Sequence, residues 1–66
     1  MNFGNKIRDL RLKTSKTQKL IEAETAIPQR TLSDWENNKS EPTLSDAIKL
    51  AEAFGVSINQ LIGESD

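Results

Sequence analysis

The 66 residues of this chain suffice for one small domain, and they include no cysteine and no histidine. This composition excludes a disulfide framework and a zinc site built from cysteine and histidine, so helix packing must supply the stability. The formal net charge is only −1, yet residues 1–39 hold eight basic and five acidic side chains, a net +3. A basic end of this kind can steer a nearly neutral molecule onto nucleic-acid phosphates.

The sequence gives no sign of export or of a membrane span. The first ten residues, MNFGNKIRDL, are charged and lack the apolar run of a signal peptide. No uninterrupted apolar stretch approaches the length that a membrane-spanning helix needs. The lack of cysteine fits a reducing compartment. We therefore expect a cytoplasmic protein without a membrane segment.

Two helices are predicted in the first part of the chain. Apolar residues recur at spacings of four and three near the N-terminus (Phe3, Ile7 and Leu10). This spacing predicts an amphipathic helix over about residues 3–14. Thr17 is a suitable N-cap for a second helix over about residues 18–24, with Ile21 facing inward. That helix is too short to be stable alone, so it must pack against the others.

A third helix is predicted from Pro28, which suits a first helical position, to about Asn37. At about 100° per residue, one side of this helix is mostly apolar (Pro28, Leu32, Trp35 and Glu36). The other side carries short polar and charged side chains (Arg30, Ser33, Asp34 and Asn37). Asn38 follows as a left-handed C-cap, because asparagine tolerates that conformation better than most residues.

The remaining residues predict two more helices and no strand. Residues 43–46 and 57–60 both have the pattern of a capping box, and Gly55 between them is a C-cap. The first of these helices has a periodic apolar face (Leu44, Ala47, Ile48, Ala51 and Phe54), and the second carries Ile58, Leu61 and Ile62. The expected fold is therefore all-α, a compact bundle of five short helices.

Catalysis is not expected. The chain has no histidine, cysteine or tyrosine, which removes the usual general base, thiol nucleophile and metal-binding clusters. It also lacks a glycine-rich phosphate loop. We expect no enzymatic activity, no cofactor and no bound metal.

The ordered set of residues resembles the Cro/repressor-type helix-turn-helix family, also called the Xre family. The resemblance extends without a gap from Ile7 to about Ile62. The matching residues are Ile7, Leu10 and Arg11, then Thr17-Gln18, residues 31–36, Lys39 and Pro42, then Leu44, Leu50, Ala51 and residues 54–57. Any one of these matches is weak, but their common order and spacing make the set specific.

The resemblance implies a single DNA-binding domain over residues 1–66, with the helix-turn-helix at about 18–37 and its second helix in the major groove of double-stranded DNA. Four positions match those that approach base edges (Gln29, Arg30, Ser33 and Asp34). Six match, or lie beside, phosphate-contacting positions (Gln18, Thr31, Asn37, Asn38, Lys39 and Thr43). Arg11 and Glu36 match an internal ion pair that ties the first helix to the third.

Three residues depart from the family pattern. Position 22 is usually small where the second and third helices approach each other, and here it is Glu22. Position 26 is usually a left-handed glycine, and Ala26 there costs on the order of 1 kcal/mol. Asn38 replaces another common glycine. Glu22 and Ala26 therefore make the turn the least certain part of the predicted fold.

Relatives of this kind usually bind DNA as symmetric dimers, so we expect a homodimer formed mainly through Ile58, Leu61 and Ile62. The function expected from the resemblance is a sequence-specific transcriptional regulator, a repressor. Two alternatives remain open: a protein-interaction module of the same fold without DNA binding, and an antitoxin-type regulator. A steep loss of DNA affinity with salt separates a DNA binder from the interaction module.

Overall fold

The order of elements along the chain agrees with the predicted all-α fold. The computed structural model describes residues 3–62, and no strand occurs within this range. The five helices are α1 (Phe3–Lys13), α2 (Gln18–Thr25), α3 (Gln29–Glu36), α4 (Leu44–Phe54) and α5 (Ile58–Ile62). None of them is long and apolar enough to cross a membrane.

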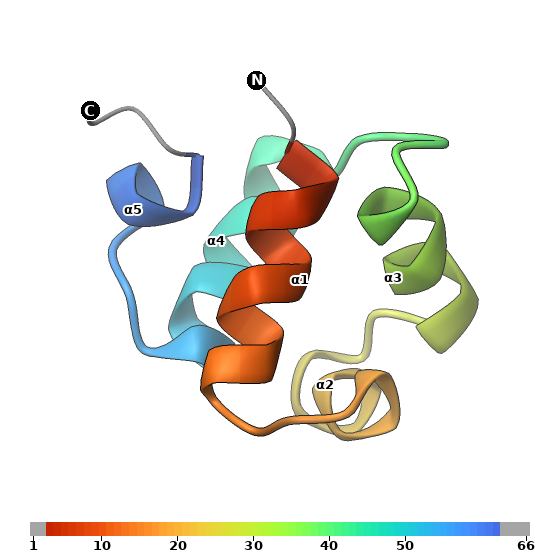
Figure 1. Cartoon of the computed structure of the whole chain (residues 1–66), viewed down its shortest axis with the longest axis horizontal. Helices are drawn as coiled ribbons and strands as arrows, with labels where there is room; N and C mark the ends of the chain where they lie inside the picture. The colour runs from red at the N-terminus through yellow and green to blue at the C-terminus, as the bar shows by residue number, and fades with distance from the viewer. Residues whose placement is uncertain (1–2, 63–66) are drawn as a thin grey trace.

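The helices α1 and α4 occupy the middle of the bundle, with α3 and α5 at opposite ends of its long axis (Figure 1). The helix α3 contacts α1 and α2, whereas α4 contacts α2 and α5. The short helix α5 also contacts α1, which brings the two ends of the described chain together. This arrangement places α3 at the outside of the bundle with one face covered and the other free.

Side-chain caps begin three of the helices at the positions that the sequence predicts. The hydroxyls of Thr17 and Thr43 accept hydrogen bonds from the amides three residues later, at 3.0 and 3.2 Å. Ser57 and Gln60 form the reciprocal pair of a capping box, with both backbone-to-side-chain bonds at 3.1 Å. Pro28 is the N-cap residue of α3 rather than its first helical residue, because its ψ of 140° is extended.

Four of the described helices end in a left-handed residue. Asn38 (φ 60°) and Gly55 (φ 72°) have the conformation predicted for them, and Ser15 (φ 58°) and Ala26 (φ 65°) end α1 and α2 in the same way. After α3 the amides of Asn38 and Lys39 donate to carbonyls of the last turn at 3.1 and 2.8 Å, as in a Schellman motif. This ending directs the chain sharply away from α3, so residues 37–43 form a separate border beside it.

The inner face of α4 differs from the predicted face. Leu44 and Ile48 were expected to face inward, but they are 70% and 43% exposed, whereas Leu50 is fully buried. The buried arc of α4 is centred between Ala47 and Phe54, and at about 100° per residue Ile48 lies about 110° away from that centre. The prediction therefore placed the apolar face of α4 too far toward the side of the helix on which Leu44 and Ile48 are exposed.

The expected dimer contact on α5 also needs one correction. Leu61 is fully buried in the core of its own chain, so it is not available to a second subunit. Val56 and Ile58 are partly buried and pack against the same core, and Ile62 is partly exposed. The error arose because α5 is so short that its central apolar residue is needed to anchor it.

Candidate nucleic-acid interface

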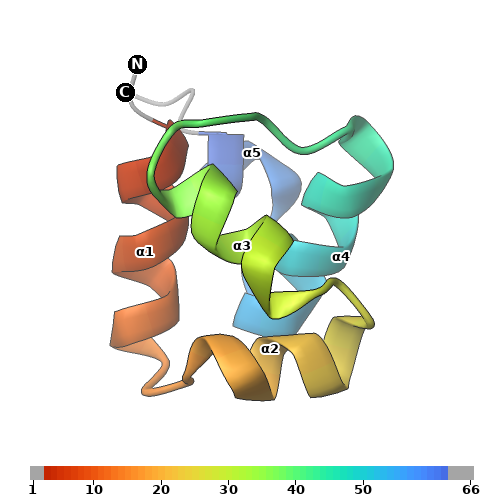
Figure 2. The same ribbon diagram turned by 90° about the vertical axis from the view of Figure 1, so that its right-hand side faces the viewer.

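The helix α3 has a buried inner face and a polar outer face that is open to solvent. Leu32, Trp35 and Glu36 are buried beneath the helix, although Pro28, predicted on the same side, is exposed. Gln29 and Arg30 are exposed, and Ser33 and Asp34 are partly exposed. Figure 2 shows α3 facing the viewer, with α1, α2 and the segment 37–43 around it. The four side chains predicted to approach bases thus belong to one projecting helix.

The turn between α2 and α3 accommodates both departures from the family pattern. Ala26 is left-handed (φ 65°), and its amide donates to the Glu22 carbonyl at 2.8 Å. The Glu22 side chain is exposed, so its carboxylate lies outside the interface between the helices. The Thr25 hydroxyl donates to the Ile21 carbonyl at 2.7 Å and accepts from the Ile27 amide at 3.2 Å. These bonds hold the turn without a glycine.

Replacing Ala26 with glycine is expected to stabilise the fold by about 0.5–1 kcal/mol. The gain comes from removing a left-handed alanine, which costs about 1–2 kcal/mol, less the added flexibility of glycine in the unfolded chain. Thermal unfolding followed by circular dichroism measures the change. The matched control is Ala23→Gly in the exposed part of α2, which should destabilise by about 1 kcal/mol. A lower melting temperature for both variants would contradict the observed turn.

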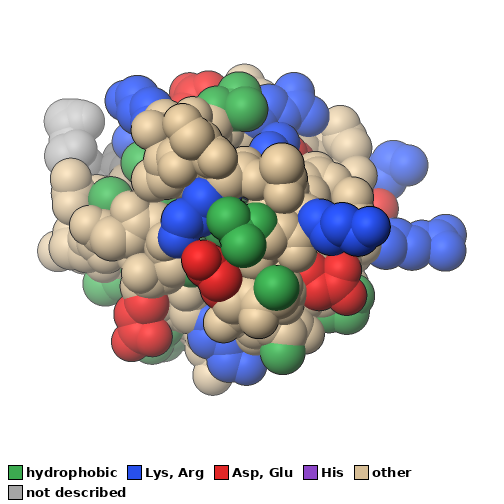
Figure 3. Space-filling model, turned by 90° about the horizontal axis from the view of Figure 1, so that it is seen from below, with side chains coloured by type: hydrophobic (Ala, Val, Ile, Leu, Met, Phe, Trp, Pro, Cys, Tyr) green, Lys and Arg blue, Asp and Glu red, His purple; other side chains and the backbone are tan. Residues whose placement is uncertain are grey.

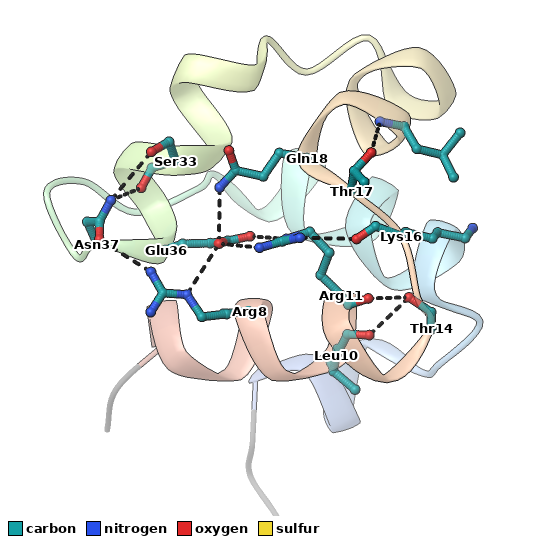
Figure 4. A network of polar contacts seen from close by, with 11 residues as sticks. Arg8, Leu10, Arg11, Thr14, Lys16, Thr17, Gln18, Ser33, Glu36 and Asn37 are labelled. Atoms are coloured by element: carbon teal, nitrogen blue, oxygen red, sulfur yellow. Dashed lines mark hydrogen bonds and ion pairs between the residues drawn. The ribbon is translucent and has the colours of Figure 1, made fainter.

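A buried carboxylate at the last residue of α3 joins three helices. Glu36 is 2% exposed, and Arg11 forms with it the ion pair predicted from the sequence, at 2.6 Å from Nε to Oε2 and 3.1 Å from Nη2 to Oε1. The Gln18 amide donates to Glu36 Oε1 at 3.1 Å, and Arg8 Nε lies 3.5 Å from the same oxygen. Figure 4 shows these side chains converging from α1 and α2 on the carboxylate of α3.

The surroundings of Glu36 keep it ionised. Burial alone would raise the pKa of this carboxyl, because a charge is costly away from water. Hydrogen bonds from Arg11 and Gln18, together with the charge of Arg11, outweigh burial and hold the pKa of Glu36 below its ordinary value of 4.5. Arg11 also donates to the Lys16 carbonyl at 3.1 Å, so the same guanidinium fixes the α1–α2 connection.

The six residues predicted to contact phosphates lie in different surroundings. Asn37 and Lys39 are exposed beside the end of α3, and Thr31 is partly exposed on it. The Asn38 side chain accepts from the Gly4 amide at 3.1 Å, which joins the start of α1 to the end of α3. Thr43, through its hydroxyl, caps α4. Gln18 lies at the start of α2 with its amide on Glu36, so these last three side chains all have a structural contact as well.

On the side of the molecule that α2 occupies, the charged side chains do not form a patch of one sign. Figure 3 looks at the end of the molecule that α2 occupies, and lysine or arginine side chains alternate there with acidic and apolar ones. Lys16, in the connection between α1 and α2, donates to Glu24 Oε1 and to the Ala53 carbonyl, both at 2.8 Å. This lysine therefore ties the α1–α2 connection to α2 and α4.

Comparison with known proteins agrees with this geometry. A family model described as helix-turn-helix matches residues 7–61, which include all of α2, the turn and α3. The chain belongs to this helix-turn-helix family. The family expected from the residues is thereby confirmed.

Two curated relatives share this helix-turn-helix domain. The chain is 31% identical over 64 residues to the cryptic phage CTXphi transcriptional repressor RstR of Vibrio cholerae, and it spans 58% of the length of that protein. It is 33% identical over 63 residues to the HTH-type transcriptional regulator y4dJ of Sinorhizobium fredii, of which it spans 82%. Each alignment covers nearly all of the chain, 97% and 96% respectively.

Arg8 is the residue of this helix-turn-helix domain that sequence reasoning missed. Its guanidinium reaches both Glu36 and, at 3.4 Å, Asn37 Oδ1 at the end of α3. The sequence carried a signal for it, because Arg8 and Arg11 are three residues apart and share one side of α1. The family resemblance drew attention to Arg11 alone.

Proposed function

We propose that this protein is a sequence-specific DNA-binding transcriptional regulator, a repressor, whose α3 enters the major groove. The proposal is carried by the exposed polar face of α3, which projects from a helix-turn-helix whose inner face is buried. The printed names of the two relatives, a transcriptional repressor and a transcriptional regulator, support it.

The base contacts would come from the four outward side chains of α3. Gln29, at its start, is suited to a bidentate pair with adenine, and Arg30 to guanine or a phosphate. Asp34 can accept from cytosine N4 and rejects bases that present only acceptors at that place. Ser33 lies between them with a hydroxyl that can donate or accept. Contacts from these side chains to base edges would distinguish one DNA sequence from another, whereas contacts to the DNA backbone would not.

The phosphate contacts would border α3 at the end that Glu36 occupies. Gln18 lies at the start of α2, where the helix N-terminus favours an anion, and its amide reaches Glu36 at 3.1 Å. Asn37, Asn38, Lys39 and Thr43 belong to the segment 37–43 that follows Glu36, and Thr31 lies on α3 itself. These residues would set the register of α3 on the duplex.

A salt titration and a site selection test the proposed function together. The affinity for random duplex DNA should fall steeply as salt rises, because bound phosphates release counterions. Selection from a random oligonucleotide pool should then yield one preferred sequence. If the protein binds no DNA at low salt, the proposal fails, and a protein-interaction module of the same fold becomes the better reading. An antitoxin-type regulator would bind DNA and also a partner protein.

We propose in addition that two copies bind one operator as a symmetric dimer. One domain covers only one half-site, and the remaining apolar surface around α5, Ile58 and Ile62 with Val56, is suited to a two-fold contact. The selected site should then contain two half-sites about one helical turn apart. Sedimentation that detects only monomers at high concentration, with and without DNA, would contradict the dimer.

A further inference from the structure

Arg8 and Arg11 both contact Glu36, but they differ in exposure. The Arg11 side chain is 14% exposed and its shortest bond to the carboxylate is 2.6 Å. The Arg8 side chain is 43% exposed, and its two contacts, to Glu36 and Asn37, are long at 3.5 and 3.4 Å. Arg11 therefore has the position of a structural partner, whereas Arg8 lies at the surface.

Arg8 brings a second positive charge to Glu36, which Arg11 already pairs. Glu36 supplies one negative charge, and Arg11 neutralises it through two hydrogen bonds. Gln18 adds a third, uncharged donor to the same carboxylate. The charge of Arg8 is thus additional to what the buried carboxylate needs. Since a guanidinium has five N–H donors and two make the long contacts, it keeps donors for a ligand.

The position of Arg8 relative to the predicted phosphate contacts indicates which ligand this is. Arg8 and Gln18 donate to the same oxygen of Glu36, and Arg8 also donates to Asn37 Oδ1. In Figure 4 Gln18 and Arg8 reach the Glu36 carboxylate from opposite sides, and Asn37 lies beside Arg8 at the end of α3. A DNA strand that passes Gln18 and Asn37 therefore passes the guanidinium of Arg8.

We propose that Arg8 binds a phosphate of the DNA backbone, so that α1 contributes to the interface together with the helix-turn-helix. This inference rests on the proposed function, since it needs DNA against α3. Glu36 and Asn37 act here as positioning groups, because they hold the guanidinium at the border before DNA arrives. Arginine is suited to this role, because its planar fork matches two phosphate oxygens.

The competing explanation is that Arg8 only stabilises the C-terminal end of α3. A cation near the last turn of a helix is favourable, and Asn37 is the residue that ends α3. The two roles predict different salt dependence. A phosphate ligand changes the slope of log affinity against log salt, whereas a purely structural residue changes stability and leaves that slope unaltered.

The test measures the salt dependence of binding to the duplex selected by the wild-type protein, by fluorescence anisotropy, for Arg8→Ala and Arg8→Lys. Arg8→Ala should reduce the slope by about 0.9 per bound protomer, so its deficit relative to the wild type shrinks about threefold between about 50 and 200 mM salt. Arg8→Lys keeps the charge and should keep the slope. The matched control is Lys13→Ala, which removes an exposed cation from another side of α1 and should bind as the wild type does.

The possible results separate this inference from the proposed function. If the wild type binds with a steep slope and Arg8→Ala has the same slope, Arg8 does not contact phosphate, and the proposed function stands. If the wild type itself shows no salt-dependent binding, the proposed function has failed. Thermal unfolding of each variant confirms that the domain is folded. If the alanine variant is not, Arg8→Gln, which also removes the charge but keeps a hydrogen-bond donor, should show the same reduced slope, and a wild-type slope for it would overturn the inference.

Discussion

Arg11→Ala is expected to destabilise the domain by about 3 kcal/mol, the lower end of the range for breaking a buried ion pair. The Glu36 side chain is 1% exposed in the wild-type structure, and without Arg11 its carboxylate keeps only Gln18 and the long contact from Arg8. A chain of 66 residues has a total stability of about 3–10 kcal/mol. The melting temperature measured by circular dichroism should therefore fall by more than about 10 °C.

Two further variants show whether the loss comes from an unpaired charge. Lys13→Ala removes an exposed cation of the same helix and should change stability by less than about 0.5 kcal/mol. Replacing both partners, Arg11→Met with Glu36→Leu, should restore most of the stability, because no buried charge remains. If Arg11→Ala is as mild as Lys13→Ala, the pair does not hold α1 against α3.

The pH dependence of the same comparison provides a second check. Folding lowers the pKa of Glu36, so the contribution of its carboxylate to stability is fully present above the ordinary value of 4.5. That contribution is lost as the pH falls through the pKa of the folded state. The difference between Arg11→Ala and the wild type should hence be largest near neutral pH and shrink on acidification.

The second large effect is a loss of DNA affinity, without a loss of stability, when an outward side chain of α3 is removed. Arg30→Ala and Gln29→Ala each remove an exposed side chain of α3, so stability should change by less than about 0.5 kcal/mol. Each loses a contact worth about 1–3 kcal/mol, which weakens binding to the selected duplex by about 5- to 150-fold. Competition between the selected duplex and single-base variants of it measures this loss.

The way the loss of affinity is distributed over the base pairs of the site distinguishes a base contact from a phosphate contact. A residue that reads a base should relax the preference at one position of the site, whereas a phosphate contact weakens binding to all sequences alike. Lys49→Ala on α4 is the matched control, because it removes an exposed cation far along the chain from α3. Wild-type binding by both Arg30→Ala and Gln29→Ala would show that α3 does not read DNA.

Local signals in the sequence predicted most of the helices and their ends. The caps at Thr17, Thr43 and Ser57 and the left-handed residues Asn38 and Gly55 depend on the chemistry of only a few neighbouring residues. The burial of Leu32, Trp35 and Glu36 beneath α3 followed from helical periodicity. These features form within one or two turns, so they are visible without knowledge of the tertiary structure.

The features that were missed depend on how the helices meet. Leu44 and Ile48 have the right spacing for a core face, but no neighbouring helix covers them. The bond from the Gly4 amide to Asn38 joins residues 34 apart in the chain. A side chain built on Gly4 would meet the Trp35 carbonyl, which explains a glycine inside a helix there. The local sequence pattern around each residue does not reveal contacts between residues that are far apart in the chain.

Part of the candidate site could likewise be predicted from the sequence, and part of it required the structure. The outward set on α3 followed from periodicity, and the family resemblance added the ion pair of Arg11 with Glu36. That Gln18 and Arg8 also reach the Glu36 carboxylate depends on the angles at which α1 and α2 cross α3. The function of Arg8 is therefore an inference that required the structure.

Chemical-shift changes of the ¹⁵N-labelled protein on adding the selected duplex test the central claim most directly, because every backbone amide reports separately. The largest changes should occur at the amides of Gln18, of residues 29–34 and of residues 37–43 other than Pro42, which has no amide proton, with smaller ones at Arg8. Changes concentrated on α4 and α5, with α3 unaffected, would contradict the account.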